Sequence, residues 1–196
     1  MHINTHVAVG IIFSLLYSYF INPIFIQVIS IFFFSFMIDF DFIFSKYAVN
    51  RNHRVLPTHG IILYLIIFFF GFLHQVFFFL GLAGISHIFI DSIDWGVGIL
   101  SPFSKKIYFG HLPKPPKEVI DENELRNKQC WFTLTYYNSK LLIIIDIIIT
   151  VSAVITIIFI DMSYLWYILI YVFFLVIHLY SFYKCKKQKD KKDELK

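Results

Sequence analysis

The sequence predicts an all-α protein, a polytopic membrane helix bundle of about six transmembrane helices with both termini in the cytoplasm. The first observation is composition: 58% of the 196 residues are hydrophobic, including 25 Phe and 12 Tyr, whereas soluble domains run about 45–50% apolar. Mean hydropathy is +0.71. The second is a recurrence of apolar runs near the ~20 residues that span a bilayer. The third is the confinement of Lys and Arg to the connections between these runs.

Six apolar runs are expected to form the helices. In chain order they are residues 7–21, 24–44, two runs within 60–100, 141–160 and 164–183. The first ends at Asn22-Pro23, because proline cannot continue a helix. The two runs within 60–100 divide near His74-Gln75. The runs are continuously apolar and do not alternate as the strands of a membrane barrel would, so strands are not expected.

Basic residues define the expected orientation. All 17 Lys and Arg fall within residues 46–54, 105–140 and 184–196. With six spans these segments share one side of the membrane, and the positive-inside rule makes that side cytoplasmic. We therefore expect a multi-pass cell-membrane protein with an embedded bundle over residues 1–183 and a polar cytoplasmic loop at about 101–140. Residues 184–196 are expected to form a basic, disordered tail.

Cysteine content and charge limit which cofactors and partners are expected. Cys130 and Cys185 are far apart in the sequence and show no paired spacing, so neither a disulfide nor a cysteine-based zinc knuckle is expected. Membrane lipids are the expected partners, with the lysines of the tail contacting anionic headgroups. Nothing in the sequence indicates nucleic-acid binding.

Ionisable residues inside the fourth run are the most informative feature. In GISHIFIDSIDWG, residues 84–96, His87 and Asp91 are spaced i, i+4 and share one helix face. Asp94 extends the same stripe. Placing such a residue at the centre of a membrane helix costs roughly 2.5–3.5 kcal/mol. A divalent cation offsets this cost, because it binds neutral imidazole and ionised carboxylate directly.

The six-span topology brings further polar residues to the same end of the bundle. Four His and four Asp gather there: His6, Asp39, Asp41, His53, His59, His87, Asp91 and Asp94. This donor set suits metal-assisted hydrolysis and favours one or two Zn²⁺ ions, with Mn²⁺ or Fe²⁺ also compatible. Carboxylates that are not ligands can accept a proton or orient the imidazoles. Arg51 and Arg54 are placed to bind a phosphate-bearing substrate.

These motifs resemble a known family. Thr5-His6, MIDFD, HRVLPTHG and GISHIFIDSIDWGVGILSPFS together resemble the YdjM-type membrane-bound metal-dependent hydrolases of bacteria and archaea. The resemblance covers about residues 1–110 and implies a metal-dependent hydrolase. The departures from the family pattern touch framing positions: Met37 and Ile38 where Pro is usual, Val55 in place of Gly, and Gly60 in place of Ser.

The order His, Asp, His, His-x3-Asp is also similar to zinc-dependent phospholipase C and related nucleases. This more distant likeness implies metal binding by His6, Asp41, His59, His87 and Asp91. It leaves Asp39 and Asp94 as the carboxylates for catalytic proton transfer, and it implies a phosphoester or lipid-like substrate such as a phospholipid. No His-x3-Glu pair follows Asp91, so the likeness does not extend to a three-metal centre.

Each residue also has a structural interpretation. His87 and Asp91 can form a hydrogen bond between helices, and Asp39 and Asp41 can simply end one. We interpret His53 as a loop residue near anionic lipid rather than as a ligand. Their shared location favours one metal site over separate coincidences.

Three functions remain open at this point. The first is a cytoplasm-facing hydrolase. The alternative is a non-catalytic membrane protein whose His/Asp cluster is a structural metal site or a helix-packing hydrogen-bond network. A proton or metal transporter is less favoured, because the outer half of the bundle lacks ionisable residues to continue a pathway. Asp146, in the fifth run, either reaches the cluster or has a structural role.

Overall fold

The computed structural model describes residues 2–48, 52–114, 116 and 125–194. Its order is α1 (Ile3–Phe20), α2 (Phe25–Met37), η1 (Ile38–Tyr47), η3 (His53–Val55), η4 (Pro57–His59), α3 (Ile61–Phe69), η5 (Phe70–Phe72), α4 (Gln75–Asp94), α6 (Leu125–Tyr137), α7 (Lys140–Ile160), η6 (Met162–Leu165) and α8 (Trp166–Glu194). The all-α class is confirmed over these residues. The one strand-like pairing among them is an isolated bridge between Val97 and Tyr108.

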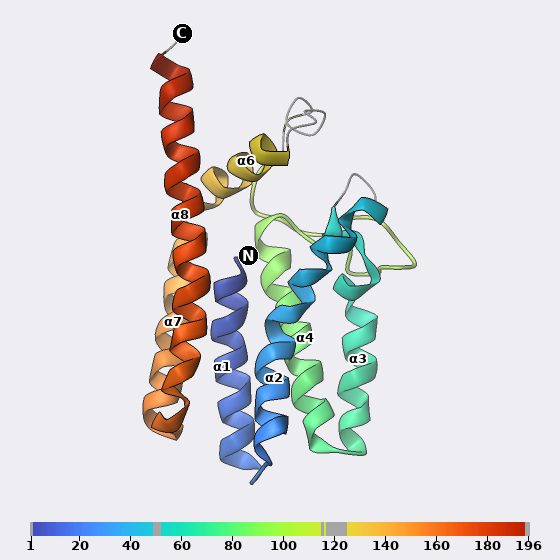
Figure 1. The fold of residues 1–196 in the computed structure, drawn as a ribbon. Helices are drawn as coiled ribbons and strands as arrows, with labels where there is room; N and C mark the ends of the chain where they lie inside the picture. Colours follow the sequence, from blue (N-terminus) through green and yellow to red (C-terminus); the bar gives the residue numbers. More distant parts are fainter. Residues whose placement is uncertain (1, 49–51, 115, 117–124, 195–196) are drawn as a thin grey trace.

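Within the described part of the chain, five helical segments are long and apolar enough to cross a membrane. They are Ile3–Phe20, Phe25–Tyr47, Gln75–Asp94, Lys140–Ile160 and Met162–Asp190. The expected third span is shorter than the other five, because Ile61–Phe72 contains only the 9 residues of α3 and the 3 of η5. The chain crosses the bundle up and down, and its two ends lie at the same end of the molecule (Figure 1).

Local sequence explains where the helices stop. The break after α1 falls at Asn22-Pro23, as expected, and α2 begins at Phe25. His74 caps α4, since its Nδ1 accepts a hydrogen bond from the Val76 backbone N–H at 3.2 Å. Asp161 separates α7 from η6, and its carboxylate accepts the Ser163 backbone N–H at 2.8 Å. Polar side chains therefore satisfy the free donors at these turns.

Two expectations about the C-terminal part are wrong. The basic residues from Lys184 onward were predicted to be disordered, but they continue α8 as far as Glu194. Lys, Gln and Glu have good helix propensity, and extending an existing helix avoids the cost of nucleation. This extension brings Cys185 beside α6, where it forms a disulfide with Cys130. The pair is 55 residues apart, so spacing in the sequence gave no sign of it.

Small residues let the first four helices approach one another closely. A Cβ atom on Gly10 would lie 2.7 Å from the Phe32 backbone oxygen and 3.0 Å from Ser35 Cβ, so α1 and α2 are in backbone contact there. A Cβ on Gly84 would overlap the Tyr64 ring, which fixes α4 against α3. Such contacts are typical of helix packing in membranes. They hold together the end of the bundle that contains the polar cluster.

Candidate metal centre

α1 begins and α4 ends at the same end of the bundle (Figure 1). Five side chains from four segments converge there. They are His6 of α1, Asp39 of η1, His59 of η4, and His87 and Asp91 of α4. His6, His59, His87 and Asp91 have fully buried side chains, and that of Asp39 is 15% exposed. The predicted convergence of the histidines and acids is therefore present.

Donor atoms of four of these residues, His6, Asp39, His87 and Asp91, lie within 4.8 Å of one another, and His59 lies beside them. His6 Nε2 lies 3.0 Å from Asp91 Oδ1 and 3.7 Å from Asp39 Oδ2. His87 Nε2 lies 3.6 Å from Asp39 Oδ1 and 3.7 Å from Asp91 Oδ2. His59 Nε2 lies 3.9 Å and 3.6 Å from the same two oxygens. Atoms about 2.0–2.2 Å from one tetrahedral zinc ion would be about 3.3–3.6 Å apart.

Hydrogen bonds at the far ring nitrogens direct two imidazoles inward. The Ser35 backbone carbonyl can only accept, so His87 Nδ1–H donates to it at 2.9 Å. His59 Nδ1–H donates to Asp41 Oδ2, also at 2.9 Å. Among the described residues, Nε2 of His59 and Nε2 of His87 are buried and have no hydrogen-bond partner. Buried polar atoms normally have one, and two inward-facing ring nitrogens beside carboxylates suit a cation.

The surroundings of His59 favour positive charge. Burial alone would lower its pKa, but hydrogen bonding to Asp41 and the charges of Asp91 and Asp41 outweigh burial and raise the pKa to about 9. In the absence of a metal, the pocket therefore draws a proton onto this imidazole. A divalent cation at the same place would satisfy the same excess of negative charge.

Asp41 and Asp39 occupy positions opposite to those predicted. Both Asp41 oxygens are engaged: Oδ1 with His53 Nδ1 at 3.0 Å, and Oδ2 with His59 Nδ1 and with the Thr58 hydroxyl. Asp41 thus orients histidines from behind and is not placed as a ligand. Asp39, predicted to be catalytic, instead has its carboxylate among the inward-facing donors. Asp39 and Asp41 are two residues apart, and this spacing alone does not show which of the two carboxylates faces inward.

A second group of donors shares Asp39. Asp39, His53 and His59 each offer an atom within 4.8 Å of the others, as do Asp39, His6, His87 and Asp91 in the first group. His53 was interpreted from sequence as a lipid-facing loop residue, and it was missed as a site residue. Its side chain is 26% exposed, so the second group is the more open of the two. Only the short spacing between His53 and His59 hinted at this position.

Arg54 and Asp94 form a buried ion pair, which changes the roles predicted for both. Arg54 Nη2 donates to Asp94 Oδ2 at 3.0 Å, and its Nη1 donates to the Asp91 backbone carbonyl at 3.2 Å. Its Nη2 also lies 3.4 Å from Asp91 Oδ1. Burial would lower the pKa of Arg54, but the charges of Asp91 and Asp94 keep that pKa above its usual range.

The guanidinium is therefore committed to the protein and is not placed to receive a substrate. Asp94 is bound to it and is not placed as a proton acceptor. Arg54 also lies over the Trp95 ring, 5.7 Å from its centroid. Arg51, the other predicted substrate-binding residue, lies outside the described residues.

Asp146 belongs to a neighbouring polar network. It accepts hydrogen bonds from the Tyr136 hydroxyl at 2.7 Å and from the Thr5 hydroxyl. Thr5 is adjacent to His6 in α1, so this network holds α1 against α7 and α6 beside the cluster. The structural interpretation of Asp146 is the one that these contacts support.

No protein-family model, curated protein or solved structure matches this chain. The argument for the site therefore depends on the geometry described above.

Proposed function

We propose that the chain is a membrane-bound metal-dependent hydrolase that acts on a phosphoester or lipid-like substrate at the cytoplasmic face. The observation that carries this proposal is the set of inward-facing donors. His59 and His87 each present an Nε2 without a hydrogen-bond partner among the described residues, beside the carboxylates of Asp39 and Asp91. The motif resemblance to YdjM-type hydrolases supports the same assignment.

The protein residues divide into ligands and supports. His6, Asp39, His87 and Asp91 would hold one zinc ion, and the second group, Asp39, His53 and His59, could hold another. Mn²⁺ or Fe²⁺ are alternatives. Bound there, the ion would act as a Lewis acid toward a phosphoryl oxygen. Asp39 belongs to both donor groups, so it would help to hold a metal in either of them, and this supports the version with two ions.

Supporting residues fix the donors in place. The Ser35 carbonyl holds the tautomer of His87 and the Asp41 carboxylate holds that of His59. Arg54 neutralises part of the charge of Asp91 and Asp94. Partners of this kind typically change metal affinity about 10–100-fold when removed.

The cytoplasmic orientation depends on the distribution of basic residues along the sequence, because all 17 Lys and Arg fall within residues 46–54, 105–140 and 184–196. The Cys130–Cys185 disulfide argues in the other direction, because disulfides are rare in the cytoplasm. The charge asymmetry involves 17 residues, whereas the cysteine pair is one contact, so the proposal follows the charge asymmetry. In the cytoplasm the two sulfurs would be adjacent thiols.

The alternative is a non-catalytic protein with a structural metal site or a helix-packing network. The complete burial of His6, His87 and Asp91 favours it, since structural zinc sites are closed whereas catalytic ones keep an open position. The partial exposure of Asp39 and His53 favours catalysis. Activity toward a substrate separates the two.

Metal content and hydrolysis of bis(4-nitrophenyl) phosphate by the purified full chain test the proposal together. Wild-type protein is expected to carry stoichiometric metal and to lose its hydrolysis on chelation. His87→Ala and Asp91→Ala are expected to lose metal, whereas His111→Ala, a change at an exposed loop residue, keeps it. Folded wild-type protein that binds neither zinc, manganese nor iron would overturn the proposal. Metal retention without hydrolysis would favour the structural alternative.

A further inference from the structure

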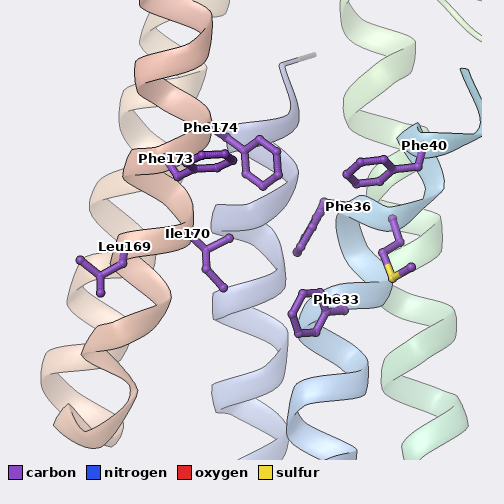
Figure 2. Close-up of a pocket in the computed structure, with 8 residues that line it drawn as sticks. Phe33, Phe36, Phe40, Leu169, Ile170, Phe173 and Phe174 are labelled. Atoms are coloured by element: carbon purple, nitrogen blue, oxygen red, sulfur yellow. The ribbon is translucent and has the colours of Figure 1, made fainter.

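An apolar groove of 510 Å³ lies between α2 and α8. Phe36 projects from α2, and Ile170 and Phe174 project from α8, into the space between these helices, whereas Leu169 points away from it (Figure 2). One wall includes Phe33, Phe36 and Phe40, and the other includes Ile170, Phe173 and Phe174. All the residues that line it are apolar, so the groove suits a hydrocarbon ligand.

The position of the groove indicates what occupies it. Both walls belong to segments that are long and apolar enough to cross a membrane. The rim is open, since Leu169 is 71% exposed, Phe173 is 61% exposed and Phe40 is 40% exposed. In a bilayer such a groove opens onto acyl chains and not onto water. Its volume lies in the range of about 300–1,000 Å³ that is usual for ligand sites.

The groove ends beside the candidate metal centre. Phe40 lies at the end of the groove where α2 passes into η1 (Figure 2), and it directly follows Asp39 in the chain. Asp39 is also the most exposed of the five converging side chains, at 15% against 0% for His6 and His87. The end of the groove at Phe40 therefore lies one residue along the chain from the most accessible carboxylate of the cluster.

We propose that this groove seats the acyl chain of a lipid substrate whose phosphoester headgroup lies at the metal centre. The proposal rests on the proposed function and specifies its substrate class. In the reaction, the oxygen of water bonds to phosphorus and the P–O bond to the departing alcohol breaks. The departing alcohol oxygen takes up a proton from the water. The tail remains in the groove, so chain length affects binding and not the chemical step.

Photolabelling of the full chain tests directly whether the groove binds the acyl chain. The probe is phosphatidylglycerol with a diazirine at mid-chain, in vesicles of phosphatidylglycerol and phosphatidylcholine, with labelled peptides identified by mass spectrometry. We expect the peptides that carry Phe33–Phe40 and Leu169–Phe174 to be labelled several-fold more than the lipid-facing peptide of α7. Ile170→Trp fills the groove and should remove this excess. Ile158→Trp, at a residue 55% exposed on α7, is the matched control and should not.

A second variant guards against misfolding. Ile170 is partly buried against the core, whereas Leu169 lies at the rim, so Leu169→Trp narrows the opening of the groove with little effect on packing. Labelling that is uniform over all lipid-facing helices, or unchanged by both groove variants, would show annular lipid only and overturn the proposal.

Kinetics separate this proposal from the proposed function. Ile170→Trp should raise KM for long-chain phosphatidylglycerol several-fold, should raise KM for its dihexanoyl analogue much less, and should carry as much metal as wild type. Equal KM values for wild type and variant on the long-chain lipid would contradict the groove assignment while the hydrolase function stands. Groove labelling without metal-dependent hydrolysis of either lipid would overturn the substrate assignment together with the proposed function.

Discussion

The first four helices and the α7–α8 hairpin are all apolar, but they are packed very differently. α1 has a mean hydropathy of 1.4 over its most apolar window, 61% of which is buried inside the protein. The corresponding windows of α7 and α8 have values of 2.9 and 2.0, with only 17% and 6% buried. The less apolar helix is thus the more enclosed one.

This difference shows where the polar residues are used. Helices that face lipid need only be apolar, and α7 and α8 present residues such as Phe159 and Leu169, which are 82% and 71% exposed. Helices that enclose His6, His87 and Asp91 must instead satisfy buried ionisable groups through partners. The two regions therefore predict opposite sensitivities to substitution.

The largest stability effect is expected at the buried ion pair. Arg54→Met would leave the carboxylates of Asp91 and Asp94 without the guanidinium that contacts both. Removing one partner of a buried pair costs about 3–5 kcal/mol. Thermal unfolding of the detergent-solubilised protein, with and without added zinc, measures this. Stability within about 0.5 kcal/mol of wild type would show that the pair does not support the cluster.

An effect of intermediate size is expected from Asp41→Asn, which tests whether Asp41 orients His53 and His59. The amide keeps the shape of the side chain but loses the charge that holds His53 and His59. Metal affinity is expected to fall about 10–100-fold, measured by competition with a chelating dye. Asp161→Asn, at the C-cap of α7, is the control, and this variant should bind metal as wild type does. A complete loss of metal would instead identify Asp41 as a direct ligand.

A smaller effect is expected from helix packing. Gly10→Ala forces apart the contact between α1 and Phe32 of α2, and overpacking of this kind costs about 1–3 kcal/mol. Val151→Ala, at a residue 50% exposed on α7, should change the free energy of unfolding by less than about 0.5 kcal/mol. Equal effects at the two positions would mean that the hairpin is as tightly packed as the first four helices.

The helices could be predicted from the sequence because the hydrophobicity of a run and the residues that break it are local properties of the chain. The breaks at Asn22-Pro23 and near His74 follow from proline and capping chemistry, and five long apolar helices lie where they were expected. The short third helix was less well predicted, because the sequence of an apolar run does not show where the α-helix within it ends. The helical tail was missed, because lysine-rich segments are compatible with both helix and disorder.

The composition of the site could be predicted, but the role of each residue could not. His87 and Asp91 share a face at i, i+4 whatever surrounds them, so their pairing was visible in advance. Whether Asp39 or Asp41 faces inward depends on the 3₁₀ geometry of η1, which no spacing rule fixes. Likewise, Arg54 and Asp94 are 40 residues apart, and only the fold shows that they neutralise each other.

X-ray absorption at the zinc edge, on purified protein reconstituted with zinc, tests the central claim most directly. The account predicts a first shell of nitrogen and oxygen at about 2.0–2.2 Å with imidazole scattering, and loss of that signal in the His59→Ala, His87→Ala double variant. A shell containing sulfur from Cys130 or Cys185, or a spectrum unchanged in the double variant, would contradict it.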